Sequence, residues 1–176
     1  ILIDGKPVRF ANPRQAMDKR IGMVFQEQSL IPTLTVMENI FLGREPHRMG
    51  VIDYGRLEED TRAVLKRLEA ENLISPTTVL GNLSVAQQQV VEIAKALSYD
   101  AKVLIMDEPT AALASQEVAV LTGLVRRLQA RGIAVIFISH RLIEVFELAQ
   151  RVTVLKDGQK VATALTPELS MGKIVE

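Results

Sequence analysis

Two adjacent carboxylates, Asp107 and Glu108, follow an apolar run of four residues and precede Pro109. Burying a carboxylate is costly unless a cation or hydrogen bonds compensate for the lost water. A carboxylate at a strand end can hold Mg²⁺, usually through water, and a second one beside it can orient or deprotonate an attacking water. The pair therefore predicts phosphoryl transfer to water, with a divalent cation that neutralises phosphate charge. A solvated strand end that Pro109 terminates fits the dipeptide alone equally well.

Two further polar side chains follow apolar runs elsewhere in the chain. Gln26 comes after the run 21–25, and His140 follows the run 133–138 and Ser139. Ligands of open α/β sheets bind at the carboxyl ends of the strands, so neighbouring strands would bring these side chains and the carboxylates to one edge. There an imidazole can steady a terminal phosphate, and a glutamine can sense metal and water. Alone, His140 is more often a helix-start residue than a ligand, and Gln26 says little.

The segments that must position these residues alternate in their periodicity. Short, evenly apolar segments predict strands, and apolar residues three or four apart predict amphipathic helices. The first predicted strand is 21–25. After the middle of the chain, a strand over 102–106, a helix over 118–132, a strand over 133–139 and a helix over 140–149 follow one another, and a hairpin over 151–165 then turns at Asp157-Gly158. Near the start, Asp4-Gly5 predicts a tight turn between two strands, and Asn12 predicts a helix cap. The alternation implies a largely parallel sheet with helices on both faces.

The middle of the chain, roughly 29–98, follows a helical pattern. Thr35 and Glu38 have capping-box spacing, and Gly43 is expected to end their helix. The expected elements after it are a helix over 56–73, a loop over 75–82 and a helix capped by Ser84.

Composition narrows the class of protein. Of 176 residues 48% are hydrophobic, which suffices for a core, and 21 basic residues balance 21 acidic ones. The zero net charge and the absence of Trp argue against a general nucleic-acid-binding surface. There is no cysteine, which excludes disulfides and cysteine metal sites. The longest apolar runs are too short to cross a bilayer, and no charged leader precedes them. The opening "ILIDGK", without methionine, looks like the middle of a domain.

Five motifs, taken together, carry a family resemblance. The stretches "LSVAQQQVVEIAKALSYDAKVLIMDEPTAAL" and "VIFISHRL" closely resemble the ATP-binding cassette (ABC) ATPases, in particular the first cassette of bacterial monosaccharide (ribose, galactose or xylose) importers. The motifs, in chain order, are the Q-loop at Gln26, the signature "LSVAQ" (83–87), Walker B "VLIMDE", the D-loop "AALA" (111–114) and the switch histidine His140. Each motif alone is modest, but five in the right order are specific.

The resemblance implies a fold and a division of the chain. It implies a P-loop NTPase-like α/β core, residues 1–28 and 99–176, with an inserted α-helical subdomain, residues 29–98. It further implies ATP and Mg²⁺ as cofactors. The implied partners are a second nucleotide-binding cassette, transmembrane permease subunits and, indirectly, a periplasmic sugar-binding protein, but no nucleic acid. The implied location is the cytoplasmic face of the bacterial cell membrane, as a peripheral subunit.

The resemblance also implies a role for each matching residue. Asp107 and Gln26 would organise Mg²⁺, Glu108 would be the general base, and His140 would contact the terminal phosphate. Gln26 would also couple the site to the permease. The signature residues Ser84, Val85, Ala86 and Gln87 would bind the nucleotide held by the partner cassette, since amides at a helix start attract anions.

The match fails at three places. No segment fits the P-loop pattern G-x-x-x-x-G-K-[ST], so we expect this chain by itself to bind ATP weakly and to expose sheet edges, with poor solubility or pairing as the result. Val85 and Ala86 replace the usual signature glycines, and Ala114 stands where many cassettes have aspartate. Two alternatives stay open: a non-transport ABC ATPase, and a non-enzymatic module that binds a permease or a partner cassette.

Overall fold

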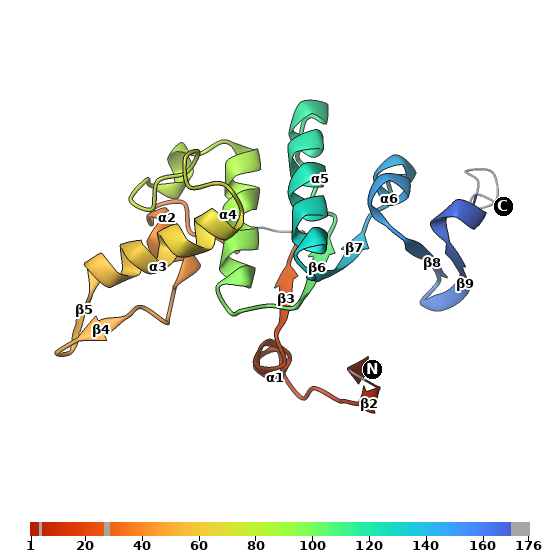
Figure 1. Ribbon diagram of the computed structural model, residues 1–176, viewed down its shortest axis with the longest axis horizontal. Helices are drawn as coiled ribbons and strands as arrows, with labels where there is room; N and C mark the ends of the chain where they lie inside the picture. Colours follow the sequence, from red (N-terminus) through yellow and green to blue (C-terminus); the bar gives the residue numbers. More distant parts are fainter. Residues whose placement is uncertain (4, 27–28, 170–176) are drawn as a thin grey trace.

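The computed structural model describes residues 1–3, 5–26 and 29–169 (Figure 1). A parallel sheet of three strands lies at its centre in the order β3-β6-β7, with β3 at Ile21–Val24, β6 at Val103–Asp107 and β7 at Ala134–Ile138. The register pairs Val24 with Met106 and Asp107 with Ile138. The three predicted strands are therefore neighbours, and their carboxyl ends meet at one edge.

Two long helices cover one face of this sheet, α4 (Val85–Leu97) and α5 (Ser115–Ala130). These helices and alternate strand positions supply fully buried core residues, among them Val24, Leu104, Met106, Ile93, Leu97, Val125 and Leu128. Further fully buried core residues come from α2 (Val36–Ile40), α3 (Tyr54–Arg67) and the segment after α3, among them Val36, Ile40, Leu65 and Leu80. The other strand positions are more open, with Met23 38%, Ile136 51% and Ile138 45% exposed. The shorter helices α1 (Pro13–Asp18) and α6 (Leu142–Leu148) contact β3 and α5 respectively. The predicted alternation of strands and helices is confirmed.

The start of the chain forms as its turn signals predict. A small hairpin joins β1 (Leu2–Ile3) to β2 (Lys6–Pro7), and Gly5 has a φ of +76° that suits a tight turn, whereas Asp4 lies outside the described residues. Asn12 caps α1, because its side chain accepts a hydrogen bond from the Gln15 amide at 3.1 Å.

The segment 29–98 holds helices and one feature that the sequence pattern missed. Its elements are α2 (Val36–Ile40), β4 (His47–Arg48), β5 (Val51–Ile52), α3 (Tyr54–Arg67), the 3₁₀ helix η1 (Leu80–Asn82) and α4. The expectation of an all-helical segment is wrong at the β4–β5 hairpin. Its turn residues Met49 and Gly50 both have positive φ, +53° and +82°, as two-residue hairpin turns need. Figure 1 shows α2, α3 and the β4–β5 hairpin at one end of the molecule, with α4 between them and the central sheet.

Arg44 fastens the carboxyl-terminal ends of α2 and α4 together. Its Nη2 atom donates hydrogen bonds to the Ile40 carbonyl at 3.0 Å and to the Ser98 hydroxyl at 2.7 Å. Its guanidinium carbon lies 3.5 Å from the centroid of the Tyr99 ring, an attractive cation–aromatic arrangement.

Ser29 fastens the same half of α4 to the segment that follows β3. The buried Glu92 carboxylate accepts a hydrogen bond from the Ser29 amide and another from its hydroxyl at 3.3 Å. Lys95 donates to the Ser29 hydroxyl at 3.1 Å. Both contacts lie in the last two turns of α4, so this end of the helix is fixed to the sheet side of the molecule.

The last part of the chain contains a second hairpin and the helix after β7. Strands β8 (Arg151–Lys156) and β9 (Gln159–Leu165) pair as predicted around Asp157-Gly158, and the 3₁₀ helix η2 (Thr166–Glu168) follows. Helix α6 begins at Leu142 rather than at His140, so His140 lies in the loop before it. In the described residues, no helix combines the length and the apolar character needed to cross a membrane.

Candidate functional site

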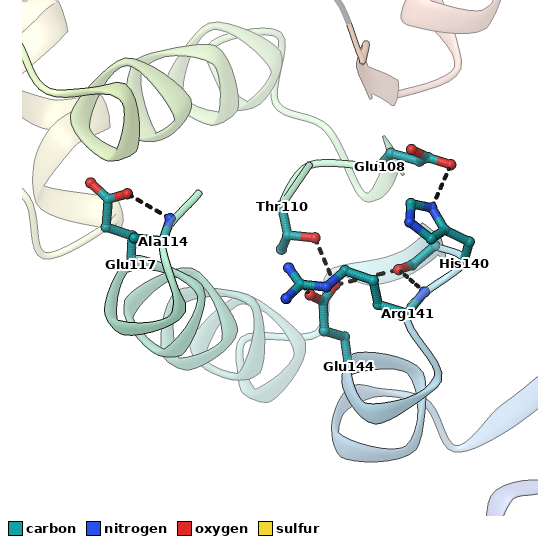
Figure 2. Close-up of polar contacts among 8 residues, drawn as sticks. Glu108, Thr110, Ala114, Glu117, His140, Arg141 and Glu144 are labelled. Atoms are coloured by element: carbon teal, nitrogen blue, oxygen red, sulfur yellow. Dashed lines mark hydrogen bonds and ion pairs between the residues drawn. The ribbon is translucent and has the colours of Figure 1, made fainter. Parts of the chain in front are cut away.

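The loops after β6 and β7 bring Glu108 and His140 into contact (Figure 2). The Nδ1 atom of His140 lies 3.0 Å from Oε1 of Glu108, within hydrogen-bond distance. The Glu108 amide donates to the Ile138 carbonyl at 3.0 Å, which carries the pairing of the two strands one residue beyond β6. The imidazole is well exposed, whereas only 28% of the Glu108 side chain is. The contact therefore presents an imidazole to solvent and holds a carboxylate behind it.

Glu108 has an unusual backbone. Its φ is +45°, in the left-handed region that L-residues other than Asn and Asp seldom adopt, and Pro109 restricts it further. Such strain costs free energy, persists only where neighbouring contacts enforce it, and clusters at functional sites. Here the hydrogen bond from the Glu108 amide to the Ile138 carbonyl and the contact with His140 are two of those contacts.

A pocket of about 200 Å³ lies beside this pair. It is shared by the strand-end residue Gln26, the carboxylate Glu108 and the first residue of α4, Val85. Its remaining lining residues are Phe25, Gln88, Gln89, Pro109, Ala111, Ala112 and Leu113. The structure thus brings together Gln26, Glu108 and Val85 in one pocket and joins His140 to Glu108.

Asp107 is the last residue of β6 and fits a phosphate-bound magnesium ion. Within the described ranges, no side chain forms a hydrogen bond or an ion pair with its carboxylate. The described residues also hold no group of three or more His, Asp or Glu side chains that could bind a metal by themselves. Mg²⁺ commonly uses one or two protein oxygens and takes its other ligands from phosphates and water. A single carboxylate suits that ligand set, but Asp107 is not among the residues that line the pocket with Gln26, so a shared Mg²⁺ site of these two residues stays a prediction.

The signature residues start α4 in a capping box. The Ser84 hydroxyl accepts a hydrogen bond from the Gln87 amide at 3.3 Å, and the Gln87 side chain accepts one from the Ser84 amide at 3.0 Å. Gln87 also donates to the Leu73 carbonyl at 3.4 Å. The box uses the amides of Ser84 and Gln87, so the amides of Val85 and Ala86 are those left to attract an anion at this helix start.

Ala114 starts α5 without a side-chain cap. Its φ and ψ of −70° and 158° are those of a normal N-cap residue, but its methyl group accepts nothing from the helix amides. Glu117 compensates in part, because its carboxylate accepts a hydrogen bond from the Ala114 amide at 3.0 Å (Figure 2).

Sequence reasoning missed two residues of this site, Thr110 and Glu144. Glu144 is buried and its carboxylate accepts a hydrogen bond from the Thr110 hydroxyl at 2.7 Å (Figure 2). In the sequence Glu144 looks like an ordinary acid in the first turn of a helix. The signal that could have revealed it is its place four residues after His140, in the first turn of the helix that follows the strand end.

Known families and proteins that this chain resembles identify its family. The family described as "ABC transporter" matches residues 1–111. A ribose import ATP-binding protein of Streptomyces avermitilis is 50% identical over 164 residues, which cover 93% of this chain and 32% of that protein. A ribose import ATP-binding protein of Burkholderia thailandensis is 50% identical over 178 residues and covers 100% of this chain and 35% of that protein. The chain thus spans about a third of the length of these relatives.

Solved structures agree on the fold. A nucleotide-free ATP-binding cassette from an ABC transporter superposes with a TM-score of 0.79 at 26% identity, over 98% of this chain and 74% of that one. The cbiO1 protein of Clostridium perfringens, part of an ABC transporter complex, superposes with a TM-score of 0.78 at 28% identity, over 99% and 68%. These matches confirm the predicted ABC ATPase fold class and the resemblance read from the motifs. The chain belongs to the ABC transporter family.

Proposed function

We propose that the protein containing this chain is the ATP-hydrolysing subunit of an ABC-type sugar import system. The observation that carries the proposal is the 3.0 Å contact between Glu108 and His140 at neighbouring strand ends, beside the pocket that Gln26 shares. A carboxylate and an imidazole so placed suit attack of water on a terminal phosphate. The import of ribose or a related sugar is supported by the names of the relatives.

In this proposal the residues at the strand ends share the steps of ATP hydrolysis. Glu108 accepts a proton from the attacking water, and Asp107 with Gln26 holds Mg²⁺. When bound, Mg²⁺ neutralises charge on the ATP phosphates. His140 donates a hydrogen bond to the terminal phosphate, and Gln26 links the site to the permease. The partly buried position of Glu108 favours a base that accepts its proton away from bulk water.

The contact between His140 and Glu108 constrains where the imidazole carries its protons. A carboxylate accepts hydrogen bonds only, so the 3.0 Å contact needs a proton on Nδ1. A neutral ring then has no proton on Nε2, and Nε2 can donate to a phosphate oxygen only when the ring is an imidazolium. His140 therefore donates to phosphate either as an imidazolium or after releasing Glu108.

The signature residues act on a second cassette in this proposal. Ser84 and Val85 are exposed at the start of α4, where Val85 and Ala86 offer their amides and Gln87 holds the turn. ATP would lie between two cassettes, with the helical subdomain of residues 29–98 inserted into a core of 1–28 and 99–176. The other partners are permease subunits and, through them, a periplasmic sugar-binding protein. The site of action is the cytoplasmic face of the cell membrane.

The test uses a chimera in which this chain replaces the matching segment of the Burkholderia thailandensis relative, because the two align over the whole chain. Glu108→Gln should leave ATP binding intact and lower the hydrolysis rate at least about 100-fold, since general bases contribute on that scale. Glu147→Gln is the matched control, because Glu147 is half exposed on α6 and pairs with Arg126. Hydrolysis by Glu108→Gln at the parental rate would refute the role of Glu108.

A second candidate applies to these 176 residues taken alone: a non-enzymatic module that binds a permease or a partner cassette. The observation that favours it is the lack of any G-x-x-x-x-G-K-[ST] segment in the sequence. Pull-down of permease by the chain alone, together with hydrolysis in the chimera, would separate the two: the module binds but never hydrolyses, even in the chimera.

A further inference from the structure

Glu144 is a buried carboxylate that the proposed mechanism leaves without a task. It lies in the first turn of α6 and is 4% exposed. Its Oε2 atom accepts hydrogen bonds from the Thr110 hydroxyl at 2.7 Å and from the Ser139 hydroxyl at 3.4 Å (Figure 2). Arg141 Nη1 lies 2.8 Å from Oε1 as an ion pair, without the angle of a hydrogen bond. Because burying a carboxylate is costly, these contacts are what keep it there.

The contacts of Glu144 join two loops that are far apart in the sequence. Thr110 is 2% exposed and stands two residues after Glu108, whereas Ser139 directly precedes His140. An acid in the first turn of a helix ordinarily interacts with the amides of its own helix. The ion pair with Arg141, the N-cap residue of α6, is local to the helix, but Oε2 of Glu144 is bonded to a hydroxyl 34 residues earlier, so stabilising α6 accounts for only part of its contacts.

We propose that Glu144 is a positioning residue that sets the separation of Glu108 and His140. It acts through Thr110 on one loop and Ser139 on the other. The inference rests on the proposed function, because it assumes that Glu108 and His140 work on ATP. The left-handed backbone of Glu108 needs neighbouring contacts to hold it, and the bond from Thr110 to Glu144 fixes the loop just beyond it. Losing that bond lets the carboxylate drift from the imidazole.

The kinetic test is made in the chimera. Glu144→Ala should lower kcat for ATP hydrolysis by about 10- to 100-fold, because a shift of about 1 Å in a catalytic group costs that much. KM for ATP should stay within about twofold, since Glu144 is buried and is not among the residues that line the pocket beside Glu108. Glu147→Ala, on the same helix but half exposed, should change neither value.

A second pair of variants removes the same bond from the other loop. Thr110→Val deletes the hydroxyl at nearly constant volume and should lower kcat as Glu144→Ala does. Thr110→Ser keeps the hydroxyl and should retain the parental kcat. Should Glu144→Ala fail to fold, this pair decides the question by itself, because Thr110→Val removes only one hydrogen bond.

A spectroscopic readout separates positioning from a purely structural role. The ¹⁵N signal of the His140 Nδ1 atom reports its hydrogen bond to Glu108 and is assigned by its loss in His140→Gln. Glu144→Ala should move this signal toward its position in Glu108→Gln, whereas Glu147→Ala should leave it in place. A lower melting temperature with an unmoved signal and the parental kcat would overturn the inference. If Glu108→Gln also hydrolyses at the parental rate, the proposed function itself fails, and the two failures are thereby distinguished.

Discussion

The left-handed backbone of Glu108 predicts that glycine is a more stabilising substitute there than alanine. Glu108→Gly and Glu108→Ala both remove the carboxylate and its contact with His140, so their difference reports the backbone alone. A left-handed conformation costs an L-residue about 1–2 kcal/mol, and glycine costs about 0.5–1 kcal/mol in additional chain entropy. With φ at +45°, the glycine variant should be the more stable of the two by about 0.5–1 kcal/mol.

The control is the same pair of substitutions at Glu59, inside α3, where the side chain is 73% exposed. Its backbone is helical, so alanine should be more stable than glycine by about 1 kcal/mol. The prediction is therefore a reversal of sign between two glutamates of one chain.

The assay is urea unfolding of the four variants, with midpoints compared at a common slope. If the isolated chain associates, as the open positions of the sheet lead us to expect, thermal melting of the same variants in the chimera replaces it. Alanine more stable than glycine at Glu108, by the margin found at Glu59, would show that the backbone there is unstrained. The positive φ of Glu108 would then no longer support a functional role for the loop after β6.

Three other outcomes are expected. Gly22→Ala should destabilise the protein by about 1–3 kcal/mol, because the new methyl group would lie 3.2 Å from Cβ of both Ala96 and Ala101. Gly123→Ala in α5 meets nothing closer than 3.5 Å and should stabilise the protein by about 0.5–1 kcal/mol. Unfolding curves of the two variants test this difference. Ala114→Ser should add about 1 kcal/mol by capping α5, and unchanged stability in the same assay would contradict the geometry of that helix start. The isolated chain should show no ATP binding at micromolar nucleotide in calorimetry, and a clear micromolar isotherm would refute the importance given to the missing P-loop pattern.

The sequence predicted the starts of several helices well. The capping residues Asn12, Thr35 and Ser84 were each identified from short-range spacing, and each one accepts the hydrogen bond expected of it. Where the stop signals were unusual, the predicted boundaries were wrong. Helix α3 ends at Arg67 rather than near residue 73, because Glu69, not a glycine, takes the left-handed conformation that follows it.

The sequence predicted which strand-end residues lie near one another, but not the contacts between the loops that hold them. The strand ends were read as one edge only on the condition that the strands are neighbours, since the order β3-β6-β7 depends on crossovers that no local pattern encodes. The bond between Thr110 and Glu144 joins residues 34 positions apart and has no periodic signal. The roles of Glu108, His140, Gln26, Asp107 and the signature residues all stay predictions.

Helix α4 is held more firmly at its carboxyl-terminal end than at its start. Charged side chains hold its carboxyl-terminal half, namely Arg44, Glu92 and Lys95. Near its start the described contacts with other segments are hydrogen bonds from two neutral side chains, Gln87 to the Leu73 carbonyl at 3.4 Å and Gln88 to the Leu83 carbonyl at 3.0 Å and the Leu80 carbonyl at 3.4 Å. Thirteen residues at about 1.5 Å each make α4 about 20 Å long, so a tilt of about 10° about its carboxyl-terminal end moves its first residues by about 3 Å. That displacement is about the length of a hydrogen bond. It is enough to make or break a contact at the start of α4 while the carboxyl-terminal end of the helix scarcely moves.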